Sequence, residues 1–250
     1  KARLASAVQI DIDLPEEEEQ RPLDFAAQGE IDFKEGKYRL AVQSWRHALV
    51  DDPRNGAILL LLGQAFFALG QYDDAAGATQ AALAMLPEDK WGVVVTHYKE
   101  LYTNIGDYTT QIRAAEKARD EKPELPALHF LLGYHFGYLN YPKQAVRELD
   151  KVLAQFPKDK IAQKLRDEFY AKLSDEEKTA ADEQAKKLAD EAKAAAGANK
   201  SETAKPGDRD KSDGKDSSPS GDKSDAEKKD GDETDGDSNQ EKAAASGVDI

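Results

Sequence analysis

The stretch Leu59–Ala76, LLLLGQAFFALGQYDDAA, places two glycines inside a run of leucine, phenylalanine and alanine. Such a run is compatible with a membrane span, a buried helix or one unit of a repeat. A span needs about 20 apolar residues, but this run contains Gln64 and is followed by acidic residues from Asp73 onward. We therefore expect no membrane insertion, and Gly63 and Gly70 need another explanation.

A repeat provides that explanation. Prolines recur at separations of 34, 36 and 34 residues, at Pro53, Pro87, Pro123 and Pro157. Apolar residues precede each proline with a helical period. In three of the four units a glycine and an alanine lie twelve residues apart: Gly29 with Ala41, Gly63 with Ala75, and Gly133 with Ala145. Because small residues let two helices approach closely, each unit is predicted to be an antiparallel helix pair.

Each unit also carries signals that end its helices. Gly36, Gly70 and Gly106 lie where the first helix of a unit should end, and Asn140 takes this position in the fourth unit. Glycine and asparagine readily adopt the left-handed conformation that closes a helix. The proline of each unit should stop its second helix, because proline lacks an N–H and disfavours helix in the residue before it.

With this period and these signature positions, the sequence resembles the tetratricopeptide repeat (TPR) family. The predicted fold class is all-α, a right-handed superhelical solenoid of antiparallel helix pairs. The TPR domain is predicted at 22–173, with repeats at 22–55, 56–91, 92–125 and 126–158 and a capping helix at 159–173. The tryptophan-bearing junction Pro87–Gly92 and the segment YTTQIRAAE, Tyr108–Glu116, also loosely resemble bacterial TPR proteins of unassigned role.

The third unit departs from the pattern. It carries Lys99 and Gln111 where the other units carry glycine and alanine, and its preceding junction is two residues longer. Both side chains are large, so the two helices of this unit should stand further apart there. We expect a local irregularity of the stack at this unit.

Outside the repeats the composition changes. Residues 1–21 are predicted to form an irregular N-terminal arm, in which no signal peptide is visible. Residues 174–196 are charged and alanine-rich, which predicts a helix or a linker. Residues 197–250 contain no aromatic residue and no leucine, so we predict a disordered acidic low-complexity tail. The compartment stays open between cytoplasm and periplasm.

Charge and composition exclude several functions. The formal net charge is −14 and cysteine is absent. Nucleic acid is not an expected partner, because a phosphate backbone binds clustered lysine and arginine. The four histidines form no HExxH motif, and no glycine-rich phosphate loop is present. We predict no catalytic residue, no metal site and no cofactor. An enzyme with an unrecognised site is the minor alternative.

The TPR resemblance implies a binding scaffold whose first helices line a concave groove. The family's groove positions fall in this chain on Phe33, Lys34, Leu60, Gln64, Phe67, Thr96, Glu100, Thr103, Phe130, Tyr134 and Tyr138. TPR domains that clamp a peptide carboxylate use cations at such positions. The corresponding positions here hold Ala26, Glu30, Leu60 and Gln64, so a partner of the carboxylate-clamp type is not expected.

Two functions remain. The first is a non-catalytic scaffold or adaptor that binds a partner peptide or helix in an aromatic-lined groove. The alternative is a structural subunit, or a self-associating component of a larger assembly, without exchangeable peptide binding. For each aromatic residue at a groove position, the alternative is that it packs between helices as part of the core.

Overall fold

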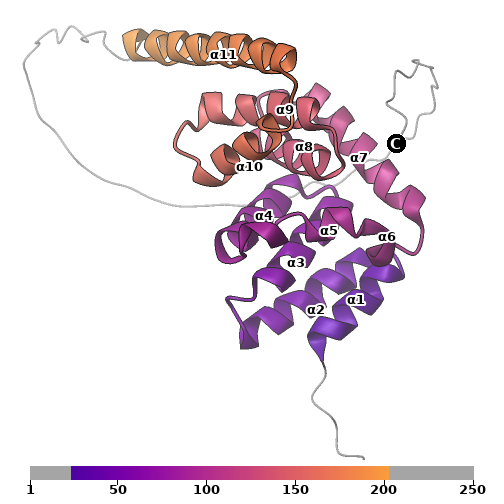
Figure 1. Ribbon diagram of the computed structural model, residues 1–250. Helices are drawn as coiled ribbons and strands as arrows, with labels where there is room; N and C mark the ends of the chain where they lie inside the picture. The colour runs from indigo at the N-terminus through magenta and orange to yellow at the C-terminus, as the bar shows by residue number, and fades with distance from the viewer. Residues whose placement is uncertain (1–23, 203–250) are drawn as a thin grey trace, which may run out of the picture. The chain divides into compact units, whose positions relative to one another are not determined.

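The computed structural model describes residues 24–202, which form eleven α-helices and one short 3-10 helix and contain no strand (Figure 1). In chain order these are α1 (Phe25–Lys34), α2 (Tyr38–Asp51), α3 (Gly56–Ala68), α4 (Tyr72–Met85), η1 (Glu88–Lys90), α5 (Val93–Thr96), α6 (Tyr98–Leu101), α7 (Ile105–Glu121), α8 (Pro126–Tyr138), α9 (Pro142–Gln155), α10 (Lys160–Tyr170) and α11 (Asp175–Glu202). The predicted arm at 1–21 and the tail beyond Glu202 lie outside the described residues. The predicted all-α solenoid of helix pairs is confirmed.

Glycines set the close approach within the pairs α1/α2, α3/α4 and α8/α9. A Cβ atom on Gly63 would lie 2.6 Å from Thr79 Oγ1 and 3.4 Å from the carbonyl of Ala75. One on Gly133 would lie 2.7 Å from Leu149 and 3.3 Å from the carbonyl of Ala145. The predicted crossing of glycine against alanine is therefore confirmed in these two pairs.

The turns between paired helices also follow the prediction in three units. Gly36, Gly70 and Asn140 have φ values of 73°, 70° and 68°. Gly106 is different, and the prediction that it ends a helix is wrong. It lies in the first turn of α7, where its N–H donates to Asn104 Oδ1 at 3.1 Å. The reason is that the helix it should end is broken.

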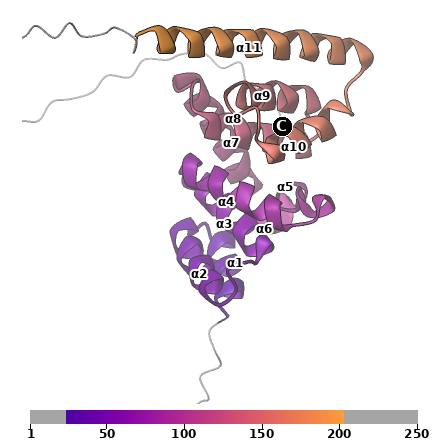
Figure 2. The same ribbon diagram turned by 90° about the vertical axis from the view of Figure 1, so that its left-hand side faces the viewer.

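In the third unit two single turns, α5 and α6, stand in place of a continuous first helix. Lys99 occupies the register position at which glycine permits a tight crossing, and a lysine side chain cannot fit there. The expected irregularity is confirmed. As a consequence α8 packs directly against α4 (Figure 1 and Figure 2). Gln80 Nε2 of α4 also donates to Oδ2 of Asp159, the N-cap of α10, at 2.8 Å.

The last helices follow the fourth unit. Helix α10 packs against α9 and α8, with Leu165 and Phe169 fully buried. Helix α11 begins with a capping box, in which Glu177 N–H donates to Ser174 Oγ at 3.3 Å and Ser174 N–H donates to Glu177 Oε2 at 3.1 Å. This helix ends at Glu202, so the predicted start of the tail at residue 197 falls within it.

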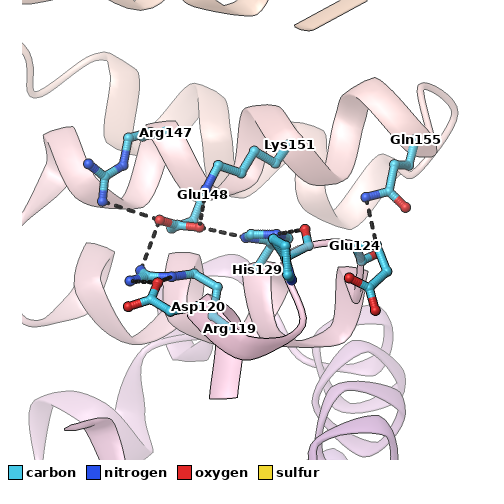
Figure 3. A network of polar contacts seen from close by, with 9 residues as sticks. Arg119, Asp120, Glu124, His129, Arg147, Glu148, Lys151 and Gln155 are labelled. Carbon is cyan, nitrogen blue, oxygen red and sulfur yellow. Dashed lines mark hydrogen bonds and ion pairs between the residues drawn. The ribbon is translucent and has the colours of Figure 1, made fainter. Parts of the chain in front are cut away.

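A buried ionic cluster, the Glu148 cluster, joins α7 to α9 (Figure 3). Glu148 is 0% exposed and accepts from His129 Nδ1 at 2.6 Å and Arg119 Nη1 at 3.1 Å. Lys151 and Arg147 approach the same carboxylate, each at 3.3 Å. Burial raises the pKa of Glu148, but the hydrogen bond from His129 and the charges of Lys151 and Arg119 outweigh it and hold that pKa at about 2.

His129 has a polar partner at each ring nitrogen. Its Nδ1 faces the Glu148 carboxylate and its Nε2 lies 2.7 Å from the carbonyl of Pro123. The cluster therefore links the α7–α8 turn to α9 through His129.

Candidate functional site

An open cavity of about 480 Å³ lies between the first helices of units one to three. Its aliphatic lining comprises Ala57, Leu61, Leu86, Val93, Val94 and Leu101, and its polar lining comprises Glu30, Lys34, Lys90, His97 and Glu100. We call this space the α1–α3–α5 cavity. It combines an apolar floor with two carboxylates and two ammonium groups at its edge.

Helical register places these side chains. Glu30 and Lys34 are four residues apart on α1, and Ala57 and Leu61 are four apart on α3, so each pair shares one helix face. Opposite them, α5 presents Val93, whose side chain is 39% exposed. An exposed valine beside a half-buried leucine gives the cavity an accessible apolar surface.

Only part of the predicted groove lies at this cavity. Lys34 and Glu100 line it. Thr96 and Thr103 are exposed but outside its lining, and Tyr138 is half-buried, with its hydroxyl donating to Glu168 at 3.0 Å. The remaining six are at most 3% exposed: Phe33, Leu60, Gln64, Phe67, Phe130 and Tyr134. The expectation of an aromatic-lined groove is corrected, because these side chains belong to the core.

The chain itself covers the predicted groove. Tyr102, which follows α6, is 3% exposed and packs edge-on against Phe33 with ring centroids 4.9 Å apart. Gln64 Nε2 donates to its hydroxyl at 2.7 Å, and the hydroxyl donates to Gln111 Oε1 at 2.5 Å. Tyr38 lies 6.5 Å away between ring centroids. We call the surrounding side chains of Phe33, Tyr38, Gln64 and Gln111 the Tyr102 seat.

The other buried aromatics have internal partners as well. The Phe67 ring lies 4.2 Å from the His135 ring, and Tyr134 donates to the carbonyl of Trp91 at 2.6 Å. Sequence reasoning missed this cover because the groove positions were taken from the regular family register, although an irregular third unit was expected. A signal was present in Gln64 and Gln111, two amides at positions facing apolar surroundings, since buried amides need hydrogen-bond partners.

One comparison with known proteins supports the repeat in the first part of the chain. Residues 26–90, which include the first two helix pairs, match the family model described as tetratricopeptide repeat. The first two helix pairs are therefore tetratricopeptide repeats. No curated protein matches it. Within residues 24–202, no helix is both long and apolar enough to cross a membrane.

Solved structures similar to this chain include two of proteins named MamA. One, "MamA RS-1 ArsTM double mutant", has 15% identity, covers 68% of this chain and 93% of its own, and has a TM-score of 0.28. The other, "MamA AMB-1 C2221", has 19% identity, covers 66% of this chain and 96% of its own, and also has a TM-score of 0.28. TM-scores this low do not establish a structural relationship between these proteins and this chain.

A second cavity of about 660 Å³ lies where α4 meets the fourth unit. Ala76 and Gly77 of α4 face Ala127 and Phe130 of α8 across it. Phe156, at the end of α9, lines the cavity and is 51% exposed. The break in the third unit creates this space, because it brings α4 directly against α8.

Proposed function

We propose that this TPR protein is a non-catalytic interaction scaffold that binds a segment of a partner protein in the α1–α3–α5 cavity. The observation that carries the proposal is an open apolar cavity on the first helices, with Leu61 and Val93 accessible in its lining. Accessible apolar surface of this kind anchors large side chains of a partner.

The charges at the cavity support one kind of partner. Lys34 and Lys90 are balanced by Glu30 and Glu100, so the cavity is not a cationic clamp for a carboxylate. A short helix or extended peptide that inserts an aliphatic or aromatic side chain, flanked by charges of both signs, fits this lining.

Side-by-side affinity capture tests the proposal. The baits are the wild-type chain and the variants Leu61→Glu and Val93→Asp, with Val50→Asp as the control, because Val50 is 75% exposed on α2 and outside the cavity. We expect both cavity variants to lose at least about tenfold in affinity for the captured partner, while the control keeps it. Equal capture by all four baits would overturn the proposal.

The choice of variants follows from burial. Phe67→Ala and Tyr134→Ala are unsuitable, because both side chains are at most 2% exposed and their removal would test core packing. Leu61 and Val93 instead line the cavity and are accessible.

The second cavity favours the alternative of self-association. Phe156 is a large, half-exposed aromatic beside apolar lining, which is the composition of contact surfaces between proteins. Light scattering of wild type and Phe156→Ser tests this alternative. A concentration-dependent mass that falls in the variant supports self-association, whereas a monomer mass for both chains contradicts it.

A further inference from the structure

We propose that the segment Val93–Asn104 is an internal ligand of the surface formed by α1 and α3, and that a partner segment carrying a tyrosine competes with Tyr102 for its seat. The part about the partner rests on the function proposed above. The partner presents a tyrosine side chain, and it displaces the segment Val93–Asn104 of this chain.

The Tyr102 seat is built for a phenol. Phe33 packs edge-on against the ring, Gln64 donates to the hydroxyl and Gln111 accepts from it. A tyrosine hydroxyl is both donor and acceptor and satisfies both amides. A phenylalanine in the same place would leave two buried amide groups without partners, which sites of this kind reject strongly.

The segment that delivers Tyr102 is not a continuous helix, although Val95 and Leu101 within it are buried. It consists of two single turns, α5 and α6, which are separated at His97 with φ −109° and ψ 24°. Helices this short have little stability of their own. Thr96, Lys99 and Thr103 are exposed, so one side of the segment faces solvent.

Firm anchors flank the segment. Before it, Trp91 is 3% exposed, its indole donates to the carbonyl of Leu86 at 3.0 Å, and its own carbonyl accepts from Tyr134 at 2.6 Å. At its other end, Asn104 caps the 17-residue helix α7. The segment can therefore detach between fixed ends while the paired helices stay in place, which is the behaviour of a low-stability local unit.

The α1–α3–α5 cavity lies beside this segment and shares its residues Val93, Val94, His97, Glu100 and Leu101. A partner that first fills the cavity is thus placed against the segment that it must displace. Removal of α5 and α6 would join the cavity to the part of the Tyr102 seat that lies on α1 and α3, namely Phe33 and Gln64.

A peptide supplied in trans tests the inference directly. The probe is the fluorescently labelled peptide of residues 93–104, VVVTHYKELYTN, and the matched control peptide carries Tyr102→Phe. The full chain with Tyr102→Ala has an empty seat, so we expect it to bind the probe at least about tenfold more tightly than wild type does. We expect the Phe peptide to bind this variant at least about tenfold more weakly than the probe.

Two results would overturn the inference. A folded Tyr102→Ala chain that binds neither peptide would show that the surface does not accept the segment as a ligand. Equal affinity for the two peptides would show that the amides do not select a hydroxyl.

Hydrogen exchange on the wild-type chain provides a second measurement if Tyr102→Ala fails to fold. We expect the amides of Val95–Tyr102 to exchange through local opening, at least about a hundredfold faster than the amides in the centre of α3. Exchange of both sets at the same slow rate would mean that the segment never detaches, and would refute the inference.

The experiments separate this inference from the function on which it rests. If the labelled peptide binds as expected while Leu61→Glu leaves partner capture unchanged, the proposed function fails and the internal ligand remains. If Leu61→Glu abolishes capture while the peptide does not bind, the partner uses the cavity alone.

Discussion

At the scale of single residues, buried charged groups mark the positions where a substitution should reduce the stability of this chain most. Glu148 is fully buried and holds three cationic side chains and His129 around one carboxylate. In the sequence His129 is one of four histidines that form no HExxH motif. Its partner lies 19 residues away on α9, and no local pattern connects the two. The cluster could therefore be found only from the structure.

Neutralising Glu148 should destabilise the chain strongly. In Glu148→Gln the largely buried Arg119 loses its countercharge, and removing one partner of a buried ion pair costs about 3–5 kcal/mol. Urea denaturation followed by circular dichroism measures this loss. The control is Asp120→Asn, whose side chain is 70% exposed, and we expect a change below about 1 kcal/mol for it. Similar small losses in both variants would contradict the structural role of the cluster.

His135 should make stability depend on pH. Burial lowers its pKa to about 3, and Tyr108 lies 2.8 Å from its Nδ1. Between pH 6.5 and 4.5 His135 takes up a proton in the unfolded chain but stays neutral in the folded chain. The free energy of unfolding should therefore fall on acidification, by up to about 1.4 kcal/mol per pH unit from this residue.

The variant His135→Asn isolates this contribution, because its amide oxygen keeps an acceptor for Tyr108. We expect its free energy of unfolding to decline less steeply than that of wild type between pH 6.5 and 4.5. Below pH 4.5, protonation of Glu148 adds a further loss in both chains, since its pKa of about 2 lies below the unfolded value. Parallel curves from pH 6.5 to 4.5 would count against a neutral buried His135.

At the scale of helices, the small residues of the repeat determine how each pair packs. The sequence predicted the pairs, the left-handed turns at Gly36 and Gly70, and the irregular third unit, because these depend on local pattern. It could not predict that Gly106 would join α7. That outcome follows from the break before it, where Lys99 prevents the regular crossing.

Two glycines on facing helices of one pair give a matched test of this packing. In Gly63→Ala the new methyl group would lie 2.6 Å from Thr79 Oγ1, so we expect a loss of about 1–3 kcal/mol from overpacking. Gly77 lies mid-helix in α4, and its added Cβ would meet no atom within 4 Å. We expect Gly77→Ala to stabilise the chain by about 0.5–1 kcal/mol. Thermal unfolding of the two variants measures these changes in stability. A stability change of the same sign in both variants would contradict the packing described here.

At the scale of the whole molecule, the fold was predictable and most of the site was not. The all-α fold of helix pairs is encoded in a repeating pattern, which the sequence displays four times. The groove was inferred from a family register that assumes regular neighbours. In this chain Tyr102 and α8 cover the predicted groove positions, so Leu60 and Phe67 belong to the core. The accessible cavity is formed instead by Leu61 and Val93.

The accessibility of adjacent leucines on α3 tests this central claim most directly. The chain has no cysteine, so Leu60→Cys and Leu61→Cys each introduce a single thiol whose labelling rate can be measured under native conditions. Leu60 is 1% exposed, whereas Leu61 is half-buried and lines the cavity. We predict that the thiol at position 61 reacts at least about a hundredfold faster than the thiol at position 60, because a buried site reacts only through opening. Faster labelling at position 60 would show that the regular groove is open and that this account of the site is wrong.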